Sequence, residues 1–327
     1  MPNKKNLLVT LADKNYISQA KQLFSSAYWN AGWKGDYMLL AYEIPEKKLL
    51  WFRDKGIKIK KVKLIKDLKS KGKWKDVVFS KFYLFSPDFK KYKNVIFLDA
   101  DIIIRASLEN LTKIKTFAAV QDNPNFSRLE DQLKNTKKLD QQVFNEIQKK
   151  YNLDNPAFNA GVMVFNTDII KDSTFNNIID LFKKYKIIKD FPEQSRLNLF
   201  FYKKWEKLPI VYNFRPHTLI RKNLQKNKIK AIILHFTKNK PWDSKDFFNK
   251  EWDYNLKKAE LIDLKKPQKP KIWTKQQIKK YSSYIEKRLV SYNLKGIIGQ
   301  VGIFIEKISP KVYFKLKKIK QQIRIKH

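Results

Sequence analysis

Short apolar runs alternate with amphipathic helical patterns at the start of the chain. Runs over 6–11, 37–42 and 57–64 predict buried strands, and apolar positions at helical spacing predict a helix over 17–29. Pro45 and Gly56 bracket a second predicted helix, with the proline at its first position. This β-α-β-α-β order predicts a doubly wound, mostly parallel α/β sheet.

The apolar run over 94–104 contains two charges, Asp99 and Asp101. An unpaired carboxylate inside a buried strand is costly, so the strand is expected to end at Asp99. Ligands bind at the carboxyl ends of strands in open α/β sheets, and two carboxylates there suit Mg²⁺ or Mn²⁺. A solvated turn is the simpler interpretation of an isolated Asp-x-Asp, and the later segments reverse that balance.

Two segments bring further polar side chains toward this pair. A predicted helix over 77–89 carries Lys81 on the approach to the carboxylates, and a predicted strand over 117–120 is followed closely by Asp122. In a chain this rich in lysine, an ordinary exposed side chain is the alternative for Lys81. The polar stretch 123–155 is interpreted as a lid or an insertion over the site.

Small residues precede the next apolar run. Asn159, Ala160 and Gly161 come just before this predicted strand, where they allow a ligand to approach the backbone closely. Asp168 is expected to cap the helix that follows.

A later predicted helix opens with a proline and has Glu193 and Gln194 in its first turn. An acid in this place complements the helix dipole, so helix capping is the alternative role for Glu193. A strand over 232–236 carries His235 near its end, followed by a basic loop with Lys240. A lone histidine is usually structural, but this one closes a strand.

The composition limits the class of protein. The 327 residues are 43% hydrophobic and 14% aromatic, enough for a large core, and the lack of cysteine excludes disulfides and Cys-ligated zinc. The formal net charge of +39 attracts polyanions. The cations are mostly lysine and no nucleic-acid-binding signature is present, so no specific nucleic-acid partner is expected. There is no G-x-G-x-x-G after the first strand and no Walker A sequence.

The C-terminal region shows two amphipathic patterns. Apolar residues repeat at helical spacing over 297–308 and 312–323, with lysines on the other face of the second. Such helices lie on anionic membrane surfaces, and packing on the rest of the protein is the alternative. The sequence shows no signal-peptide pattern and no apolar window near ~20 residues. We therefore expect a cytoplasmic protein, peripheral on the inner face of the membrane.

The order of these segments resembles family 8 glycosyltransferases, which include glycogenin and bacterial lipooligosaccharide galactosyltransferases. The resemblance covers roughly 7–242, and single motifs are weak whereas their order is specific. The motifs are Ala12-Asp13-x-Asn15-Tyr16, Lys81, Asp99-x-Asp101, Asn159-Ala160-Gly161, Gln194 with Asn198, Tyr212-Asn213-Phe214, and His235-Phe236 followed by Lys240-Pro241-Trp242. The resemblance implies a GT-A fold that binds a UDP-sugar and a divalent cation and transfers the sugar with retention.

The resemblance also implies roles for residues of this chain. Asp99, Asp101 and His235 would ligate Mn²⁺ or Mg²⁺. The donor nucleotide would be held by Leu11, Ala12, Asp13 and Tyr16, with Tyr16 stacking on the uracil, together with Ala100, Lys81 and Lys240. The transferred hexose would be surrounded by Asn159, Ala160, Gly161, Asp122, Glu193 and Gln194, of which the last three are the catalytic candidates.

Retention of configuration leaves two routes open. Gln194 or Glu193 would act as a nucleophile opposite the departing UDP, or transfer would occur from the front face. Glu193 stands where the family usually has Asp, which shifts the sugar contact. Thr237-Lys238-Asn239 replaces a loop that commonly carries a glycine, which puts its phosphate contacts in question.

The sequence therefore predicts a catalytic domain over 1–250 and a basic helical extension over 251–327. The predicted activity is metal-dependent transfer of a hexose from a UDP-hexose to a glycan or glycolipid acceptor of the surface-polysaccharide or lipopolysaccharide type. A glycogenin-like enzyme with a soluble acceptor is one alternative. A catalytically inactive polyanion-binding protein is the alternative of another class.

Overall fold

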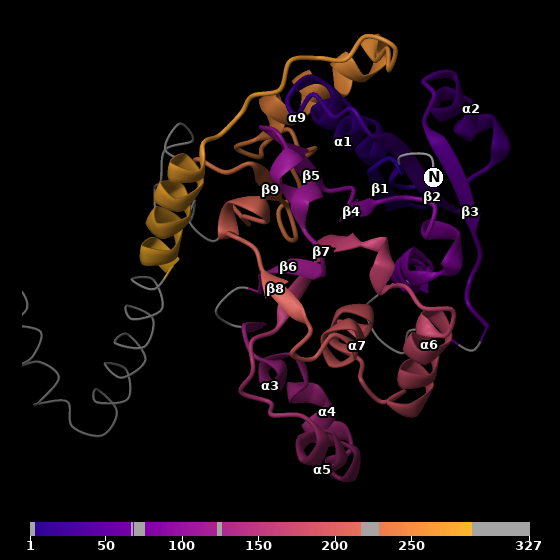
Figure 1. Cartoon of the computed structure of the whole chain (residues 1–327), viewed down its shortest axis with the longest axis vertical. Helices are drawn as coiled ribbons and strands as arrows, with labels where there is room; N and C mark the ends of the chain where they lie inside the picture. The colour runs from indigo at the N-terminus through magenta and orange to yellow at the C-terminus, as the bar shows by residue number, and fades with distance from the viewer. Residues whose placement is uncertain (1–3, 67, 69–75, 123–125, 217–228, 290–327) are drawn as a thin grey trace, which may run out of the picture. The chain divides into compact units, whose positions relative to one another are not determined.

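A mixed seven-stranded sheet forms the centre of the protein (Figure 1). The computed structural model of the chain describes residues 4–66, 68, 76–122, 126–216 and 229–289. The strand order is β3-β2-β1-β4-β7-β6-β8, and a second sheet pairs β5 with β9. The strands are β1 Leu7–Ala12, β2 Asp36–Tyr42, β3 Lys58–Val62, β4 Asn94–Leu98, β5 Ile102–Ile104, β6 Phe117–Gln121, β7 Phe158–Asn166, β8 Trp205–Lys207 and β9 Ile233–His235.

The predicted parallel arrangement is confirmed for four neighbouring strands. β3, β2, β1 and β4 all run parallel, while β7 runs antiparallel to both β4 and β6. Because of this reversal, the first residues of β7 lie beside the last residues of β4, with Leu98 opposite Val162. The sequence analysis placed Asn159, Ala160 and Gly161 before a strand. The structure instead includes all three in β7.

Helices cover both faces of the large sheet. The helices of the described residues are α1 Ile17–Trp29, α2 Glu46–Asp54, α3 Leu129–Gln132, α4 Lys134–Leu139, α5 Gln141–Lys150, α6 Thr174–Lys184, α7 Pro192–Phe200, α9 Asn249–Lys257 and a helix over 275–289. α1 packs against α9, β1 and β5. Val9 and Phe97, on the other face, belong to a buried cluster with residues of α6 and α7. Successive side chains of a strand point to opposite faces of the sheet, so α1 and α9 lie on one face and α6 and α7 on the other.

The segment predicted as a helix over 77–89 consists of two 3₁₀ helices, Asp76–Phe85 and Pro87–Phe89. Phe79, Phe82 and Phe85 are fully buried and recur every third residue. A spacing of three aligns side chains in a 3₁₀ helix, whereas it drifts around an α-helix. The phenylalanine spacing therefore favours the tighter helix.

Two predicted helix starts were wrong. α6 begins at Thr174, and Asp168 lies earlier, in a 3₁₀ turn whose cap is Asn166: the Asn166 side chain accepts a hydrogen bond from the Asp168 N–H over 2.8 Å. Pro45 is the cap residue of α2 and not its first helical residue. In both cases the helix begins after the residue that the sequence analysis placed at its start.

The polar stretch after β6 is partly helical, and its interpretation as an insertion stays a prediction. Its described part carries α3, α4 and α5, whose apolar side chains form a small core with Tyr185, Ile188 and Leu199. This core anchors the stretch to the segment around α7. Its role as a lid stays a prediction.

Contacts group the chain into two compact units, 1–282 and 283–327. α9 belongs to the first unit and crosses the predicted boundary after residue 250; the division into 1–250 and 251–327 stays a prediction. The amphipathic patterns over 297–308 and 312–323 lie outside the described residues. Within the described residues, no helix is long and apolar enough to span a membrane.

Candidate active site

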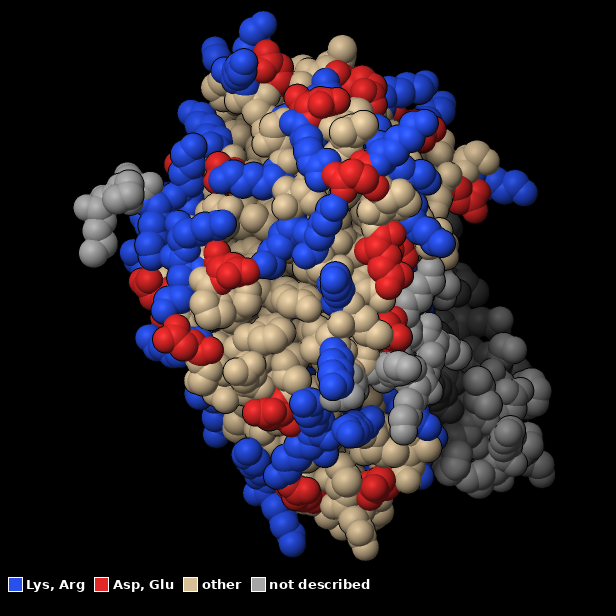
Figure 2. Space-filling view, turned by 90° about the vertical axis from the view of Figure 1, so that its right-hand side faces the viewer, with Lys and Arg blue, Asp and Glu red and all other residues tan. Residues whose placement is uncertain are grey.

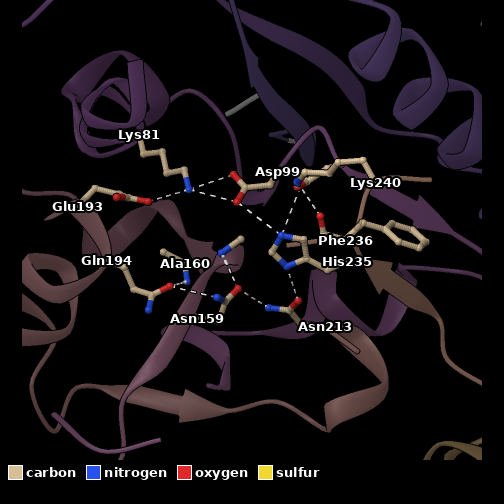
Figure 3. A network of polar contacts seen from close by, with 12 residues as sticks. Lys81, Asp99, Asn159, Ala160, Glu193, Gln194, Asn213, His235, Phe236 and Lys240 are labelled. Atoms are coloured by element: carbon tan, nitrogen blue, oxygen red, sulfur yellow. Dashed lines mark hydrogen bonds and ion pairs between the residues drawn. The ribbon is translucent and has the colours of Figure 1, made fainter. Parts of the chain in front are cut away.

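Three side chains suited to a metal ion meet at the carboxyl end of β4 (Figure 3). Asp99 follows β4, Asp101 precedes β5 and His235 ends β9; one ligand atom from each lies within 4.8 Å of the others. The His235 Nε2 atom is 3.3 Å from Asp101 Oδ1 and 3.8 Å from Asp99 Oδ2. The antiparallel pairing of β5 with β9, which sets Ile102 opposite His235, brings the histidine to the carboxylates.

Lys81 and Lys240 each pair with one of these carboxylates. The Lys81 Nζ atom lies 3.0 Å from Asp99 Oδ1 and 3.1 Å from Glu193 Oε1, and only 7% of its side chain is exposed. The alternative of an exposed lysine is therefore wrong. Lys240 Nζ donates to Asp101 Oδ2 over 2.5 Å and to the Phe236 carbonyl over 2.6 Å.

Charge pairing keeps these buried groups ionised. Burial alone would lower the pKa of Lys81, but the Asp99 and Glu193 carboxylates outweigh it and raise that pKa above its ordinary value. Burial likewise acts to raise the pKa of Asp101, and the neighbouring His235 and Lys240 hold it below its ordinary range. The site therefore presents a carboxylate at Asp101 and an ammonium group at Lys81.

The donor set fits a divalent cation. Carboxylate oxygens and an imidazole nitrogen are ligands that Mn²⁺ accepts. Three carboxylates, from Asp99, Asp101 and Glu193, face two lysines, Lys81 and Lys240, which leaves one negative charge in the cluster. A site with excess negative charge favours a cation.

Gly161 keeps the space beside this cluster open. A Cβ atom added there would lie 2.2 Å from His235 Cε1 and 2.9 Å from Asp99 Oδ2, closer than atoms pack. The Gly161 carbonyl also accepts a hydrogen bond from the Asp99 N–H over 2.8 Å. The predicted close approach at this glycine is thus made by the histidine and the aspartate.

Gln194 is held by three hydrogen bonds. Its Oε1 atom accepts from Asn159 Nδ2 over 3.1 Å and from the Ala160 N–H over 3.0 Å. Its Nε2 atom donates to Asp122 Oδ2 over 2.9 Å. The structure therefore brings together four of the six residues predicted around the hexose, and Gly161 follows directly on the same strand.

Glu193 carries a free acceptor in this region. One of its oxygens binds Lys81, while the other, Oε2, is buried and lacks a hydrogen-bond partner in the described part of the chain. Burying an unsatisfied carboxylate oxygen is unfavourable, so such an atom marks a place for a ligand group. Glu193 also lies in the first turn of α7, as the alternative role required, and its contact with Lys81 comes in addition.

The predicted nucleotide-binding residues lie at the carboxyl end of β1. Leu11 and Ala12 end this strand, and Asp13 accepts a hydrogen bond from the Asn15 N–H over 2.8 Å. The Tyr16 ring meets the Trp242 ring edge to face, with centroids 6.0 Å apart. Burial raises the pKa of the Tyr16 phenol, while the charge of Lys240 acts to lower it.

Sequence reasoning missed two residues of the site. Arg215 pairs with Asp122, with Nη2 lying 2.6 Å from Oδ1, and the Asp122 side chain is 1% exposed. Asn213 contacts both Asn159 and His235 through its amide. The sequence analysis named the motif that contains Asn213 but assigned it no role. No sequence pattern distinguished Arg215 from the many other cationic residues.

Comparisons with known proteins agree with this geometry. The model of "Glycosyl transferase family 8" matches residues 7–246. Glycosyltransferase GlyB of Streptococcus pneumoniae serotype 4 is 25% identical over 204 residues, which are 57% of this chain and 44% of GlyB. Galactinol synthase 4 of Arabidopsis thaliana is 27% identical over 199 residues, 54% of this chain and 58% of that protein. The chain thus spans about half the length of these relatives.

Solved structures show the same fold at low sequence identity. The glycosyltransferase GlyE of Streptococcus pneumoniae TIGR4 superposes with a TM-score of 0.54 at 21% identity, covering 80% of this chain and 62% of GlyE. The galactosyltransferase LgtC, solved with donor and acceptor sugar analogs, superposes with a TM-score of 0.57 at 16% identity. The match covers 77% of this chain and 95% of LgtC. The predicted GT-A fold is confirmed, and the chain belongs to glycosyl transferase family 8.

Proposed function

We propose that the protein transfers a hexose from a UDP-hexose to a glycan or glycolipid acceptor with the help of a divalent cation. The observation that carries this proposal is the cluster of Asp99, Asp101 and His235, flanked by Lys81 and Lys240. Its donors suit Mn²⁺ or Mg²⁺, and its lysines suit a diphosphate. The three residues would hold the ion, which when bound supplies Lewis-acid neutralisation of the charge that develops on the departing UDP.

The protein's own groups assist departure of the nucleotide. Lys240 follows an exposed bend, and its side chain contacts Asp101. It would therefore lie close enough to the cation site to contact a phosphate of the donor. Lys81, held charged between Asp99 and Glu193, is a fixed cation that costs little reorganisation as negative charge develops. Tyr16 at the end of β1 would stack on the uracil, with Leu11, Ala12 and Asp13 beside the ribose.

The hexose is assigned to the region of Glu193, Gln194 and β7. The free Glu193 Oε2 would accept a hydrogen bond from a sugar hydroxyl. Gln194 Oε1 already accepts two hydrogen bonds, from Asn159 and Ala160. An amide oxygen engaged in this way is a poor nucleophile, which supports front-face transfer with retention.

A glycan or glycolipid acceptor at a membrane surface is supported by the C-terminal sequence pattern. The alternative is a soluble acceptor, favoured by the likeness to a galactinol synthase. Binding of the whole protein to anionic vesicles separates the two.

Release of UDP from a panel of UDP-sugars, with Mn²⁺ or with EDTA, tests the proposal. We expect slow hydrolysis of one donor, which EDTA abolishes. UDP release that is unchanged by EDTA would contradict the metal dependence. No release, with no Mn²⁺-dependent thermal shift on adding UDP, would contradict the donor class and favour the polyanion-binding alternative.

A further inference from the structure

A chain of hydrogen bonds between buried side chains leads to His235 (Figure 3). It begins at Asp122, whose Oδ2 accepts from Gln194 Nε2 over 2.9 Å. Asn159 Nδ2 then donates to Gln194 Oε1 over 3.1 Å, and Asn213 Nδ2 donates to Asn159 Oδ1 over 2.9 Å. The Asn213 Oδ1 atom lies 2.9 Å from His235 Nδ1. All five side chains belong to residues that are at most 8% exposed.

Two backbone N–H groups of β7 set the direction of this chain. The Ala160 N–H donates to Gln194 Oε1 over 3.0 Å, and the Gly161 N–H donates to Asn159 Oδ1 over 3.0 Å. A backbone N–H can only donate, so both amide oxygens must face β7. Since Asn159 presents its oxygen, Asn213 must meet it with its NH₂ group. Reversing the Asn213 amide would set two oxygens against each other.

The oxygen of Asn213 is thereby left facing His235 Nδ1. An acceptor at 2.9 Å calls for a hydrogen on that nitrogen. The other ring nitrogen, Nε2, faces Asp99 and Asp101. We propose that Asn213 is a positioning residue, which fixes a hydrogen on His235 Nδ1 and so directs Nε2 at the cation site.

Backbone pairing holds Asn213 in place. The Phe214 N–H donates to the Ile233 carbonyl over 3.0 Å, and the His235 N–H donates to the Phe214 carbonyl over 2.9 Å. These two hydrogen bonds fix the backbone next to Asn213 against β9. They therefore hold the Asn213 side chain beside the His235 ring. Metal-binding histidines commonly donate their second ring N–H to such a partner, which orients the ring and fixes the tautomer.

Nuclear magnetic resonance of protein labelled with ¹⁵N-histidine tests the inference. The chain has three histidines, and a His235→Gln variant assigns the ring of interest. At about pH 8, we expect the wild-type Nδ1 to carry a hydrogen, because the Asn213 oxygen accepts it. Asn213→Leu has similar volume and no acceptor, so we expect its Nδ1 to lose that hydrogen. Asn213→Asp loses the donor to Asn159 but keeps an acceptor toward His235, so its Nδ1 should keep the hydrogen.

Mn²⁺ affinity gives the second measurement, and its interpretation depends on the proposed metal dependence. We expect Asn213→Leu to bind Mn²⁺ about 10- to 100-fold more weakly, and Asn213→Asp to bind nearly as wild type. A wild-type Nδ1 without hydrogen would overturn the inference, even if no variant folds. The inference would also be overturned if the Asn213→Leu protein kept the hydrogen on His235 Nδ1 and bound Mn²⁺ with wild-type affinity. A wild type that binds no Mn²⁺ but carries the Nδ1 hydrogen contradicts the metal dependence and supports the role of Asn213.

Discussion

At the scale of single residues, the site is a set of buried charges that depend on one another. Lys81 pairs with Asp99 and Glu193, Lys240 pairs with Asp101, and Arg215 pairs with Asp122. Removing one partner of a buried pair is costly, because the other charge is left without compensation. The residue changes below separate groups that act in the reaction from groups that hold the site together.

Asp101→Asn is expected to abolish Mn²⁺-dependent turnover. The amide oxygen can still accept from Lys240, and the Lys240 side chain is 29% exposed, so water compensates its charge and the thermal unfolding temperature should stay nearly unchanged. The loss of a charged oxygen donor should remove the cation instead. Turnover and calorimetric Mn²⁺ binding are measured together; a folded variant with normal activity would contradict the assignment of this ligand.

Glu193→Gln is expected to lower kcat/KM for the donor about 10- to 100-fold, since one charge-assisted hydrogen bond to a sugar hydroxyl contributes about 1.5–3 kcal/mol. Glu46→Gln on α2 is a matched control, because the Glu46 carboxylate pairs with exposed Arg53 and Lys61, away from the site. Initial rates over a range of donor concentrations decide the matter. Equal kinetics for the two variants would remove Glu193 from the sugar site.

Arg215→Met is expected to destabilise the protein by about 3 kcal/mol, as is typical of breaking a buried ion pair. Arg215→Lys keeps a cation beside Asp122 and should recover part of that stability. Chemical denaturation of both variants measures the difference. If Arg215→Met is as stable as wild type, the pair contributes nothing to the fold around Gln194.

At the scale of elements, the direction of β7 builds the site. Because β7 runs antiparallel to β4, its first residues meet the carboxyl end of β4, where Asp99 lies. Its backbone N–H groups then orient Asn159 and Gln194, and its Gly161 leaves room for His235. One strand thus supplies both hydrogen-bond direction and space.

Gly161→Ala is expected to weaken Mn²⁺ binding at least about tenfold, because the added methyl group would displace His235. Gly56→Ala is the control: Gly56 has a φ of 75°, so alanine strains the turn there, yet the nearest atom in its way is Leu264 Cδ1 at 3.5 Å. Both variants should lose stability, and only the first should lose Mn²⁺ affinity. Calorimetry on both proteins tests this, and a Gly161→Ala protein with wild-type affinity would contradict it.

At the scale of the whole molecule, the formal net charge is +39. On the face shown in Figure 2, lysine and arginine are numerous and acidic residues are interspersed among them. The lysines of the edge strand β3 follow the same pattern: Lys58 pairs with Asp36, Lys60 with Asp88 and Lys61 with Glu46. Charged side chains on an edge strand also prevent it from pairing with other chains.

Deleting Lys311 to His327 is expected to release the protein from anionic vesicles, because the second basic amphipathic pattern lies in this segment. Binding to neutral vesicles should be weak for both proteins, since it lacks the electrostatic attraction. Co-sedimentation with vesicles is the measurement, and UDP release from free donor serves as the control for an intact active site. Unchanged binding would contradict membrane attachment through this segment.

The sequence by itself determined the order of elements, the strand end at Asp99 and the family motifs. Hydrophobic periodicity and the cost of burying a carboxylate act locally, so they can be followed along the chain. Only the tertiary structure decided the direction of β7, the burial of Lys81 between two acids, and the contacts of Asn213 and Arg215. These depend on residues far apart in sequence, whose pairing no local pattern encodes. Strand direction and buried partners are set where distant segments pack, and that packing turned scattered polar residues into one site.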